Sequence, residues 1–598
     1  MNTCVYAQFA QEEKLAAQFF NEKEYSKAAD IYEDLLKKQA ESIYYYENLL
    51  QCYTLLNDNK AAEKLIDKRI KKYPTNYIYQ IDKGNFYHQT KDFEKRDKIF
   101  KDIVNLNFSS TEVVENILNS FVKRGFLSEA IKVGLNARKQ LRQPGLFIYE
   151  LSEIYFRNGQ KKEGIEELVS IIGENESILQ EVKNKVSVQL KGDDFSILSR
   201  VIIQNIQSKP ENIGLNDLLI WSFVQQKDWD GAIIQSKAID RRLKEGGLWQ
   251  LNLAFTLMNN EEYSYALKCF TDIKALGSDK RFYSQAQQGI LQCGIAQIRQ
   301  KNGGTQSELL ILEKEFLEFI NTNGVNLYSI DQMKLLAELY VYYLKDEKKG
   351  INWLNQIISM KGANPKTVAE SKINLGDAYL ISGDTWEADL LYKQVEKDYK
   401  NDPLGQEAKF KYARLCFYRG DFEWAQTQLD VLKEATTQLI SNNAMQLWLT
   451  IQDNIGLDST EEALTYYAKA DLLIFQNKFD QALLVLDTLN KVFPNHTLTD
   501  EILFAKATIA EKQNQFKEAE VYYLKIIKDH SFDILADNAL INLGKIYEFK
   551  MNDTANAKKM YEFLILNYTG SLFANEARFR YRFLRGDMKQ ESTENYWD

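Results

Sequence analysis

The stretch LAAQFFNEKEYSKAADIYEDLL, residues 15–36, contains the pattern that decides the fold. Leu15 and Phe19 are four residues apart, and Ala28, Tyr32 and Leu35 follow one another at spacings of four and three. Such spacing places apolar side chains on one face of an α-helix. A short polar break that begins with an asparagine separates the two apolar runs. The stretch therefore predicts two amphipathic helices joined by a turn.

The same pattern recurs every 34 residues, as from Leu15 to Leu49, through eight successive units without an insertion. A small residue opens the second helix, where it allows close approach of the first helix, and an aromatic residue precedes it to fill the space before the crossing. The small residues are Ala28, Ala62, Ala130, Ala232 and Ala266, and the aromatic ones are Tyr25, Phe93, Trp229 and Tyr263. No single pair of helices can bury its apolar face, so the units are predicted to stack into a continuous core.

This alternation of small and aromatic residues resembles that of tetratricopeptide repeat (TPR) proteins. The resemblance covers nearly all of residues 9–585, with Arg96 and Leu198 standing where Ala or Gly is expected. It implies an all-α fold, an α-solenoid of about fifteen helical hairpins that winds into a right-handed superhelix. It also implies that side chains of the first helix of each hairpin line a concave, peptide-binding groove.

The second half keeps the hairpins but loosens the period. Its small residues, at 388, 425, 482, 519 and 557, are 37, 57, 37 and 38 residues apart. The sequence is therefore divided into a signal-peptide remnant (1–8), an N-terminal TPR array of eight 34-residue units (9–280), degenerate helical hairpins (281–365), a C-terminal TPR array (366–585) and a polar tail (586–598). The segment 281–330 is interpreted as either a rigid bend or a hinge.

The junctions between the late units also repeat. Each has an extended apolar residue followed by an acidic or amide residue that opens the next helix and can cap its free amide groups. The junctions lie at 402–408, 495–501, 532–539 and 570–577. Over residues 366–585 they resemble bacterial cell-envelope TPR proteins, such as the outer-membrane assembly lipoproteins and the cell-division coordinator. This resemblance implies an envelope setting.

The first residues bear on the cellular location. Val5-Tyr6-Ala7, followed by Gln8, has the small-x-Ala form of a signal-peptidase site, but no basic and apolar regions precede it. Either the match is a coincidence, or the chain begins inside a signal peptide and the mature protein starts near Gln8. We favour the second interpretation, which predicts a periplasmic or outer-membrane-associated protein; a cytoplasmic location is the alternative. No run of about 18 apolar residues predicts a transmembrane segment, so an envelope association would be peripheral.

Composition excludes several classes of protein. With 6 prolines and 28 glycines in 598 residues, a sandwich or barrel with many tight turns is not expected. Hydrophobic residues at 45% and charged residues at 27% exclude disordered and membrane-channel classes. The net charge of −9 argues against nucleic acid as a partner, because a phosphate-backbone binder needs basic stripes.

Motifs for catalysis, metals and cofactors are absent from the sequence. It contains no G-x-S-x-G, no H-E-x-x-H and no G-x-x-x-x-G-K-[ST], and its three histidines and five cysteines have no metal-site spacing. The sequence therefore predicts no enzyme, no catalytic residue, no metal and no cofactor. Cys269 and Cys293 could meet on neighbouring helices; otherwise the cysteines are small buried hydrophobes.

A candidate protein-binding groove is assigned from the positions that face the groove in the TPR family. Aromatic anchors among amides and acids suit protein or peptide recognition, although ordinary solvated residues are an equal alternative. The candidates in the first five units are Tyr44, Glu47, Gln51, Asn85, His88, Glu115, Asn119, Tyr149, Glu153 and Phe156. Glu13, Glu47 and Glu115 occupy positions where grooves that grip a terminal carboxylate have Lys or Arg. A basic or neutral ligand is therefore expected.

The sequence thus predicts a non-enzymatic TPR scaffold that mediates protein–protein interactions in a bacterial periplasm or at the outer membrane, with one or more unidentified protein partners. The alternative is a cytosolic TPR adaptor or a regulator similar to a co-chaperone. An enzyme is disfavoured because the repeats occupy nearly the whole chain and leave no room for a catalytic domain.

Overall fold

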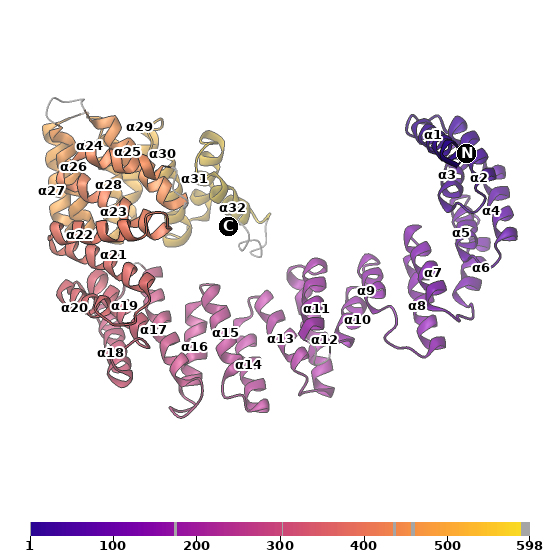
Figure 1. The fold of residues 1–598 in the computed structure, drawn as a ribbon, viewed down its shortest axis with the longest axis horizontal. Helices are drawn as coiled ribbons and strands as arrows, with labels where there is room; N and C mark the ends of the chain where they lie inside the picture. The colour runs from indigo at the N-terminus through magenta and orange to yellow at the C-terminus, as the bar shows by residue number, and fades with distance from the viewer. Residues whose placement is uncertain are drawn as a thin grey trace. The chain divides into compact units, whose positions relative to one another are not determined.

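The computed structural model describes residues 2–172, 176–301, 303–433, 438–455, 461–494 and 496–587. Every regular element in these residues is a helix, and consecutive helices pack side by side (Figure 1). The predicted all-α solenoid is therefore confirmed. The contacts divide the chain into two compact units, Met1–Gln235 and Ser236–Asp598. The division into arrays that ends at residues 280 and 365 stays a prediction.

The unit Met1–Gln235 consists of helical hairpins whose last helix, α14, continues into the second unit. A 3-10 turn over Gly192–Asp194 precedes α12. In chain order the helices are α1 (Asn2–Asn21), α2 (Tyr25–Lys38), α3 (Ile43–Leu55), α4 (Asn59–Lys72), α5 (Tyr77–Gln89), α6 (Phe93–Val104), α7 (Thr111–Lys123), α8 (Leu127–Leu141), α9 (Ile148–Arg157), α10 (Lys161–Ser170), α11 (Glu176–Gln189), α12 (Phe195–Ser208), α13 (Ile213–Gln225) and α14 (Trp229–Leu243).

The unit Ser236–Asp598 continues with hairpins and two single helices, α25 and α32. Two π-helical turns, η2 (Leu339–Leu344) and η3 (Ile546–Lys550), extend α19 and α30. The helices are α15 (Leu248–Asn259), α16 (Tyr263–Lys274), α17 (Tyr283–Gln300), α18 (Gln306–Asn323), α19 (Ile330–Glu338), α20 (Glu347–Ile358), α21 (Pro365–Ser382), α22 (Thr385–Asp398), α23 (Pro403–Arg419), α24 (Phe422–Leu432), α25 (Gln438–Asn454), α26 (Glu462–Phe475), α27 (Phe479–Val492), α28 (Thr499–Lys512), α29 (Phe516–Asp529), α30 (Ala536–Lys545), α31 (Thr554–Asn567) and α32 (Ala574–Arg585).

Close packing of a glycine on an aromatic ring recurs in these hairpins. A Cβ atom on Gly84 would collide with the ring of Phe100, and one on Gly376 would collide with the ring of Tyr392. In both hairpins the glycine and the ring are 16 residues apart. Gly544 and Tyr561 make the same contact at a separation of 17, because the π-helical turn η3 adds one residue to the first helix. The contact is thus kept although the period loosens.

Phe93 departs from the expected packing. Its side chain is 47% exposed, so the expectation that it fills the space before the helix crossing is wrong. Arg96, which stands in place of a small residue, covers the ring instead, with its guanidinium carbon 4.9 Å from the Phe93 centroid. Trp229 is buried as expected. The large Leu198 is also fully buried, so both irregular units still form hairpins.

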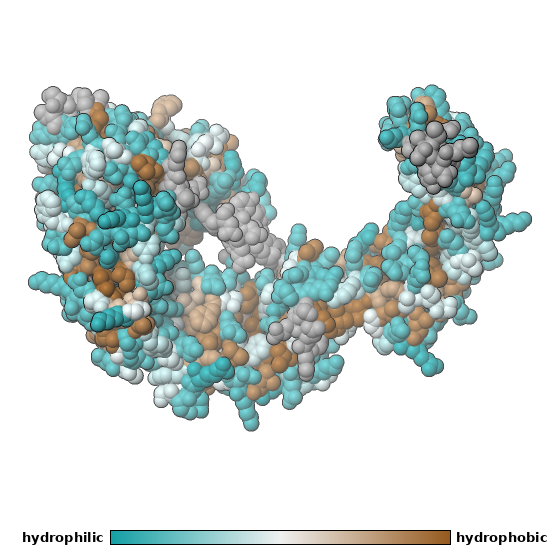
Figure 2. Space-filling view, in the orientation of Figure 1, coloured by the Kyte–Doolittle hydropathy of each residue, from teal (hydrophilic) through white to brown (hydrophobic). Residues whose placement is uncertain are grey.

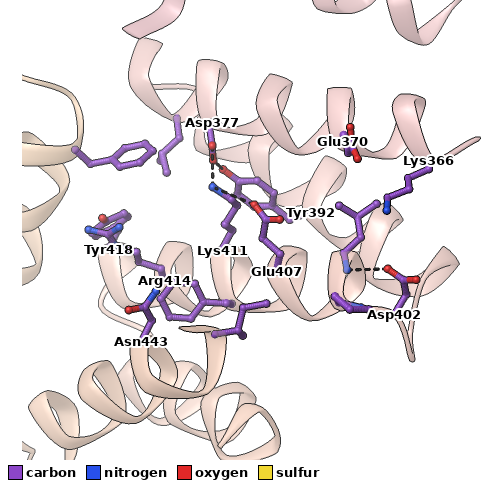
Figure 3. A pocket seen from close by; sticks show the side chains of 16 residues that line it. Lys366, Glu370, Asp377, Tyr392, Asp402, Glu407, Lys411, Arg414, Tyr418 and Asn443 are labelled. Carbon is purple, nitrogen blue, oxygen red and sulfur yellow. Dashed lines mark hydrogen bonds and ion pairs between the residues drawn. The ribbon is translucent and has the colours of Figure 1, made fainter. Parts of the chain in front are cut away.

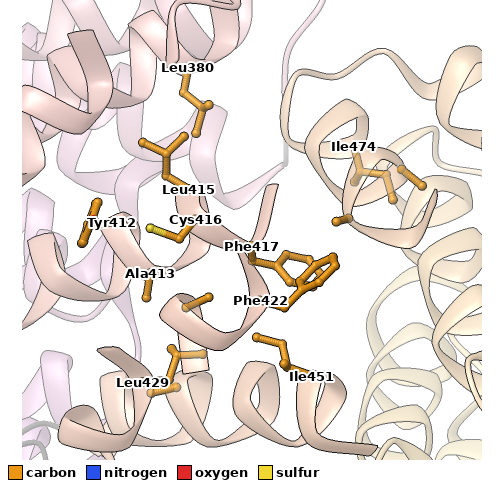
Figure 4. Close-up of a cluster of buried hydrophobic side chains, with 14 of the residues drawn as sticks. Leu380, Tyr412, Ala413, Leu415, Cys416, Phe417, Phe422, Leu429, Ile451 and Ile474 are labelled. Carbon is orange, nitrogen blue, oxygen red and sulfur yellow. The ribbon is translucent and has the colours of Figure 1, made fainter. Parts of the chain in front are cut away.

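The hydrophobic core follows the helix pairs as a series of clusters. Figure 4 shows one of them, in which Phe417 and Phe422 lie with ring centroids 5.6 Å apart. Cys416 belongs to this cluster, and the cysteines at 52, 269 and 293 are likewise buried and free. Burial raises the pKa of Cys269 and of Cys293 to about 12. The interpretation of the described cysteines as small buried hydrophobes is therefore confirmed.

Parts of both chain ends are not described. Residue 1 and residues 588–598, which include most of the polar tail, lie outside the described residues, as do the side chains of residues 2–10. Residues 2–8 of the predicted signal-peptide remnant belong to α1, and their assignment to a signal peptide stays a prediction. In the part of the chain that the structure describes, no helix has the length and apolar character needed to cross a membrane. On the face of the second unit seen in Figure 2, hydrophilic residues surround smaller apolar patches.

Candidate protein-binding grooves

The predicted groove residues all lie in the unit Met1–Gln235, on the first helix of their hairpins. None of them is fully buried. Tyr44, Glu47 and Gln51 lie on α3, Asn85 and His88 on α5, Glu115 and Asn119 on α7, and Tyr149, Glu153 and Phe156 on α9. Their role in binding stays a prediction.

The expectation of a basic ligand was based on three glutamates, and two of them already have partners within the chain. Glu47 accepts hydrogen bonds from Lys123 Nζ at 2.7 and 2.8 Å, and Arg124 lies 3.9 Å away. Glu13 accepts a hydrogen bond from the hydroxyl of Tyr45 at 3.2 Å. Glu115 is exposed. The acidic character that favoured a basic ligand is therefore weaker than the sequence suggests.

A buried aspartate that the sequence analysis missed joins three of these helices. Asp82 on α5 is 4% exposed and accepts hydrogen bonds from the Tyr46 hydroxyl at 3.0 Å and from Arg124 Nε at 2.6 Å. Arg124 also donates to the Ser120 hydroxyl at 2.7 Å. Burial raises the pKa of Asp82, and the charge of Arg124 opposes this rise. The network fixes α3, α5 and the end of α7 against one another.

Other predicted residues also have structural contacts. His88 is exposed; its ring lies edge-on to Phe126 at 5.3 Å, and its Nδ1 is 2.9 Å from Arg96. The Tyr149 hydroxyl donates to Glu181 on α11 at 3.0 Å. Phe156 packs against the core, and a Cβ atom on Gly164 would lie 3.2 Å from its ring. Gln51, Asn119 and Glu153 are exposed.

A second groove, which the sequence analysis did not assign, lies in the unit Ser236–Asp598. It is a cavity of about 650 Å³ lined by α21, α23, α25 and α26 (Figure 3). Its apolar lining comprises Leu380, Pro403, Leu404, Phe410, Ile440 and Phe475. Its polar lining comprises Lys366, Glu370, Asp377, Tyr392, Asp402, Glu407, Lys411, Arg414, Tyr418 and Asn443.

Asp377 is the centre of the hydrogen-bond network in this cavity. It is 4% exposed and accepts hydrogen bonds from Tyr392 at 2.7 Å, Lys411 at 2.8 Å and Tyr342 at 3.0 Å. Figure 3 shows Lys411 and Tyr392 directed at this carboxylate. Tyr342 comes from the π-helical turn η2. Burial and the charge of Asp377 raise the pKa of both tyrosines well above the ordinary value, so their hydroxyls stay protonated donors.

Arg414 divides this cavity from a neighbouring one. Its guanidinium lies 3.1 Å from both oxygens of Asp471, and its guanidinium carbon is 5.4 Å from the ring of Tyr418 and 5.5 Å from that of Phe475. The neighbouring cavity, of about 310 Å³, shares Phe410, Arg414 and Asn443 with the first and extends to α28. The two cavities thus lie next to each other along successive helices.

Several polar groups remain in the groove for a ligand. Lys366 is exposed, and Glu407 is partly buried, with Lys411 at 4.0 Å. Burial raises the pKa of Glu407. The hydroxyl of Tyr418 is buried beside Asp471 and is not accessible to a ligand. The described lining contains no histidine, serine or cysteine, so it offers no pair of nucleophile and imidazole base.

The sequence contained a signal for this second groove. Glu407, Lys411, Arg414 and Tyr418 follow one another at spacings of four, three and four, so they share one face of α23. The rule that assigned groove positions in the first five units also applies to this helix. The predicted groove of the first five units does not include this helix.

The helical hairpins and the cavities together define a TPR-like α-solenoid with cavities lined by polar and aromatic side chains. No family model and no curated protein matches the sequence. Among solved structures, the chain is similar to "Structure of Naa15/Naa10 bound to HypK-THB", with 12% identity over 98% of this chain and 98% of that one and a TM-score of 0.27. A similarity of this size carries no argument about partners or activity.

Proposed function

We propose that this protein is a non-enzymatic scaffold that binds protein partners through grooves lined by the first helices of its hairpins. The groove lined by α21, α23, α25 and α26 carries this proposal. Its larger cavity, about 650 Å³, has the size of a pocket for a few side chains rather than of a whole interface. Apolar walls at Leu404 and Phe410, the exposed Lys366 and the partly buried Glu407 suit an extended peptide with mixed side chains.

The proposal is tested by exchanging single groove residues and comparing the proteins retained from native cells. Lys366→Glu reverses an exposed charge in the groove, and Phe410→Ala removes an apolar wall. Lys348→Glu reverses a second exposed lysine, on α20, outside the cavity lining and is the matched control. Circular dichroism first establishes that all variants are folded.

We expect the wild type and the control to retain one or more proteins in equal amounts. Both groove variants should retain at least about tenfold less of these proteins, equivalent to about 1.4 kcal/mol of binding free energy. Once purified, the same partner should bind the wild type and the control more tightly than the two groove variants in a titration by fluorescence anisotropy. Equal retention by all four proteins would show that this groove is not the binding surface.

We further propose a setting in the bacterial periplasm or at the outer membrane. Its support is the small-x-Ala segment at Val5-Tyr6-Ala7 and the resemblance of the late junctions to envelope TPR proteins. Cell fractionation with the full reading frame, followed by N-terminal sequencing of the purified protein, tests it. A mature N-terminus near Gln8 in the envelope fraction is expected. Recovery of the uncleaved chain in the cytosol would instead favour the cytosolic adaptor or co-chaperone-like regulator.

A further inference from the structure

Outside the grooves, three potential metal ligands from two consecutive hairpins come together. One ligand atom each of Asp500, His530 and Asp533 lie within 4.8 Å of one another. Asp500 is the second residue of α28, and His530 and Asp533 lie where the chain leaves α29. Nδ1 of His530 is 2.8 Å from a carboxylate oxygen of Asp533. These residues are 30 and 33 positions from Asp500 and meet only through the hairpin packing.

The surroundings of this cluster are strongly acidic. Asp500 is 3% exposed and Glu501 is 4% exposed. Asp453 lies near Asp500 and Asp533, and the carboxyl groups of Asp500 and Glu501 lie against each other. Among the described residues, no lysine or arginine forms an ion pair with Asp453, Asp500 or Glu501. Carboxylates that are removed from water need a cation or a hydrogen-bond donor to compensate for the lost hydration.

Glu501 supplies a second observation. Its Oε2 is fully buried and has no hydrogen-bond partner, while its carboxyl group lies against that of Asp500. Buried side-chain oxygens without a partner are uncommon in folded proteins, because a lone pair removed from water is normally compensated by a donor or by a bound cation. The unpaired oxygen lies next to the residue that would be the buried ligand of the cluster.

We propose that Asp500, His530 and Asp533 bind a divalent transition-metal ion, Zn²⁺ before others. One imidazole nitrogen with two carboxylate oxygens suits Zn²⁺, whereas Ca²⁺ and Mg²⁺ prefer oxygen ligands alone. Bonds of about 2.1 Å in a tetrahedral site place ligand atoms about 3.4 Å apart. The three ligand atoms lie within 4.8 Å of one another, and Asp533, whose side chain is 49% exposed, has room to adjust to this spacing.

The ion would fix the first turn of α28 to the loop between α29 and α30. It would therefore stabilise the stacking of two hairpins in the unit Ser236–Asp598. A ligand that binds only the folded state raises stability with its concentration, so zinc should raise the melting temperature of the full chain.

The test uses the full-length protein after treatment with a chelator and removal of the chelator. Zn²⁺ is titrated by isothermal calorimetry and in competition with a chromophoric chelator, and Mn²⁺, Ca²⁺ and Mg²⁺ are titrated in parallel. His530→Gln and Asp533→Asn remove the two accessible ligands. The matched controls are His88→Gln, an exposed histidine of the other unit, and Asp529→Asn, an exposed aspartate at the end of α29.

One Zn²⁺ per chain is expected for the wild type and both controls, with a higher melting temperature on addition of zinc. Each ligand variant should bind at least about tenfold more weakly and lose the thermal shift, while its circular dichroism stays that of the wild type. Cobalt substitution should give visible absorption bands that His530→Gln changes. Binding that is equal in wild type and ligand variants, Ca²⁺ binding without Zn²⁺ binding, or no binding of any ion would each overturn the proposal.

Discussion

Asp377 on α21 and Lys411 on α23 are 34 residues apart in the chain, and their side chains form an ion pair of 2.8 Å. The unit Met1–Gln235 contains a similar pair, Asp82 and Arg124, at 2.6 Å. In each unit the buried aspartate also accepts a hydrogen bond from a tyrosine of the preceding hairpin. One carboxylate thus joins three consecutive hairpins. Because each repeat of a solenoid contacts only its neighbours, such contacts between adjacent hairpins stabilise the stack.

Asp377→Ala should destabilise the hairpins around α21 and α23. The substitution leaves the Lys411 ammonium and two tyrosine hydroxyls without their acceptor, which for a buried ion pair costs about 3 kcal/mol. Hydrogen exchange measured by mass spectrometry should show faster exchange of α21 and α23 amides, by about a hundredfold. Asp398→Ala, at an exposed aspartate that ends α22, should leave these rates unchanged.

Arg124→Gln should lower the free energy of local opening much more than Lys123→Gln does, although the two residues are adjacent. Arg124 is 9% exposed and compensates the buried Asp82, so its loss should lower the local free energy of opening by about 3–5 kcal/mol. Lys123 is 62% exposed and pairs with Glu47 at the surface, so its loss should cost less than about 1 kcal/mol. Protection of α5 and α7 amides against exchange checks both values. Equal effects of the two substitutions would contradict the assignment of Asp82 as the central acceptor.

Gly376→Ala should destabilise the hairpin α21/α22 by about 1–3 kcal/mol. The added methyl group would overlap the ring of Tyr392, which is held by its hydrogen bond to Asp377 and cannot move freely. Gly570→Ala is the matched control, because no atom lies within 4 Å of a Cβ atom placed there. Thermal unfolding followed by circular dichroism should show an earlier transition for the first variant alone.

Asp389 should contribute to the pH dependence of stability. Burial favours its neutral form, but hydrogen bonds from Lys393 and Arg419 outweigh this effect and hold its pKa below the ordinary value. The folded state therefore binds a proton less readily than the unfolded state, and the contribution of Asp389 is present above the unfolded pKa of about 4 and lost as pH falls below it.

Asp389→Asn should accordingly lower the urea midpoint at about pH 6, and the difference from the wild type should shrink as the pH falls toward about 3. Asp398→Asn, at the exposed aspartate, is the control and should give the same midpoint as the wild type throughout. A difference from the wild type that grows as pH falls would reverse the assigned direction of the Asp389 pKa.

The fold was predictable from the sequence because the repeat is a local property. Spacings of three and four residues set the helical faces, and residues such as Gly376 and Tyr392 identify the crossing of the two helices within one hairpin. The partners of the charged groove residues were less predictable. The sequence predicts Glu47 as a groove residue that favours a basic or neutral ligand, but Lys123 and Arg124, 76 and 77 residues away, lie beside it. Partners so distant in the chain leave no signal in a single sequence.

The sequence by itself thus determined the all-α class, the helical hairpins and the buried state of the described cysteines, since these depend on side-chain periodicity along a few turns of helix. The tertiary structure alone decided which charges are compensated and which remain for a ligand. Stacking of hairpins brings Asp377 to Lys411, Asp82 to Arg124 and Asp500 to His530, and the ionic state of each group depends on that neighbour. The repeat pattern specifies that hairpins stack, but the charged residue at each contact varies from one unit to the next.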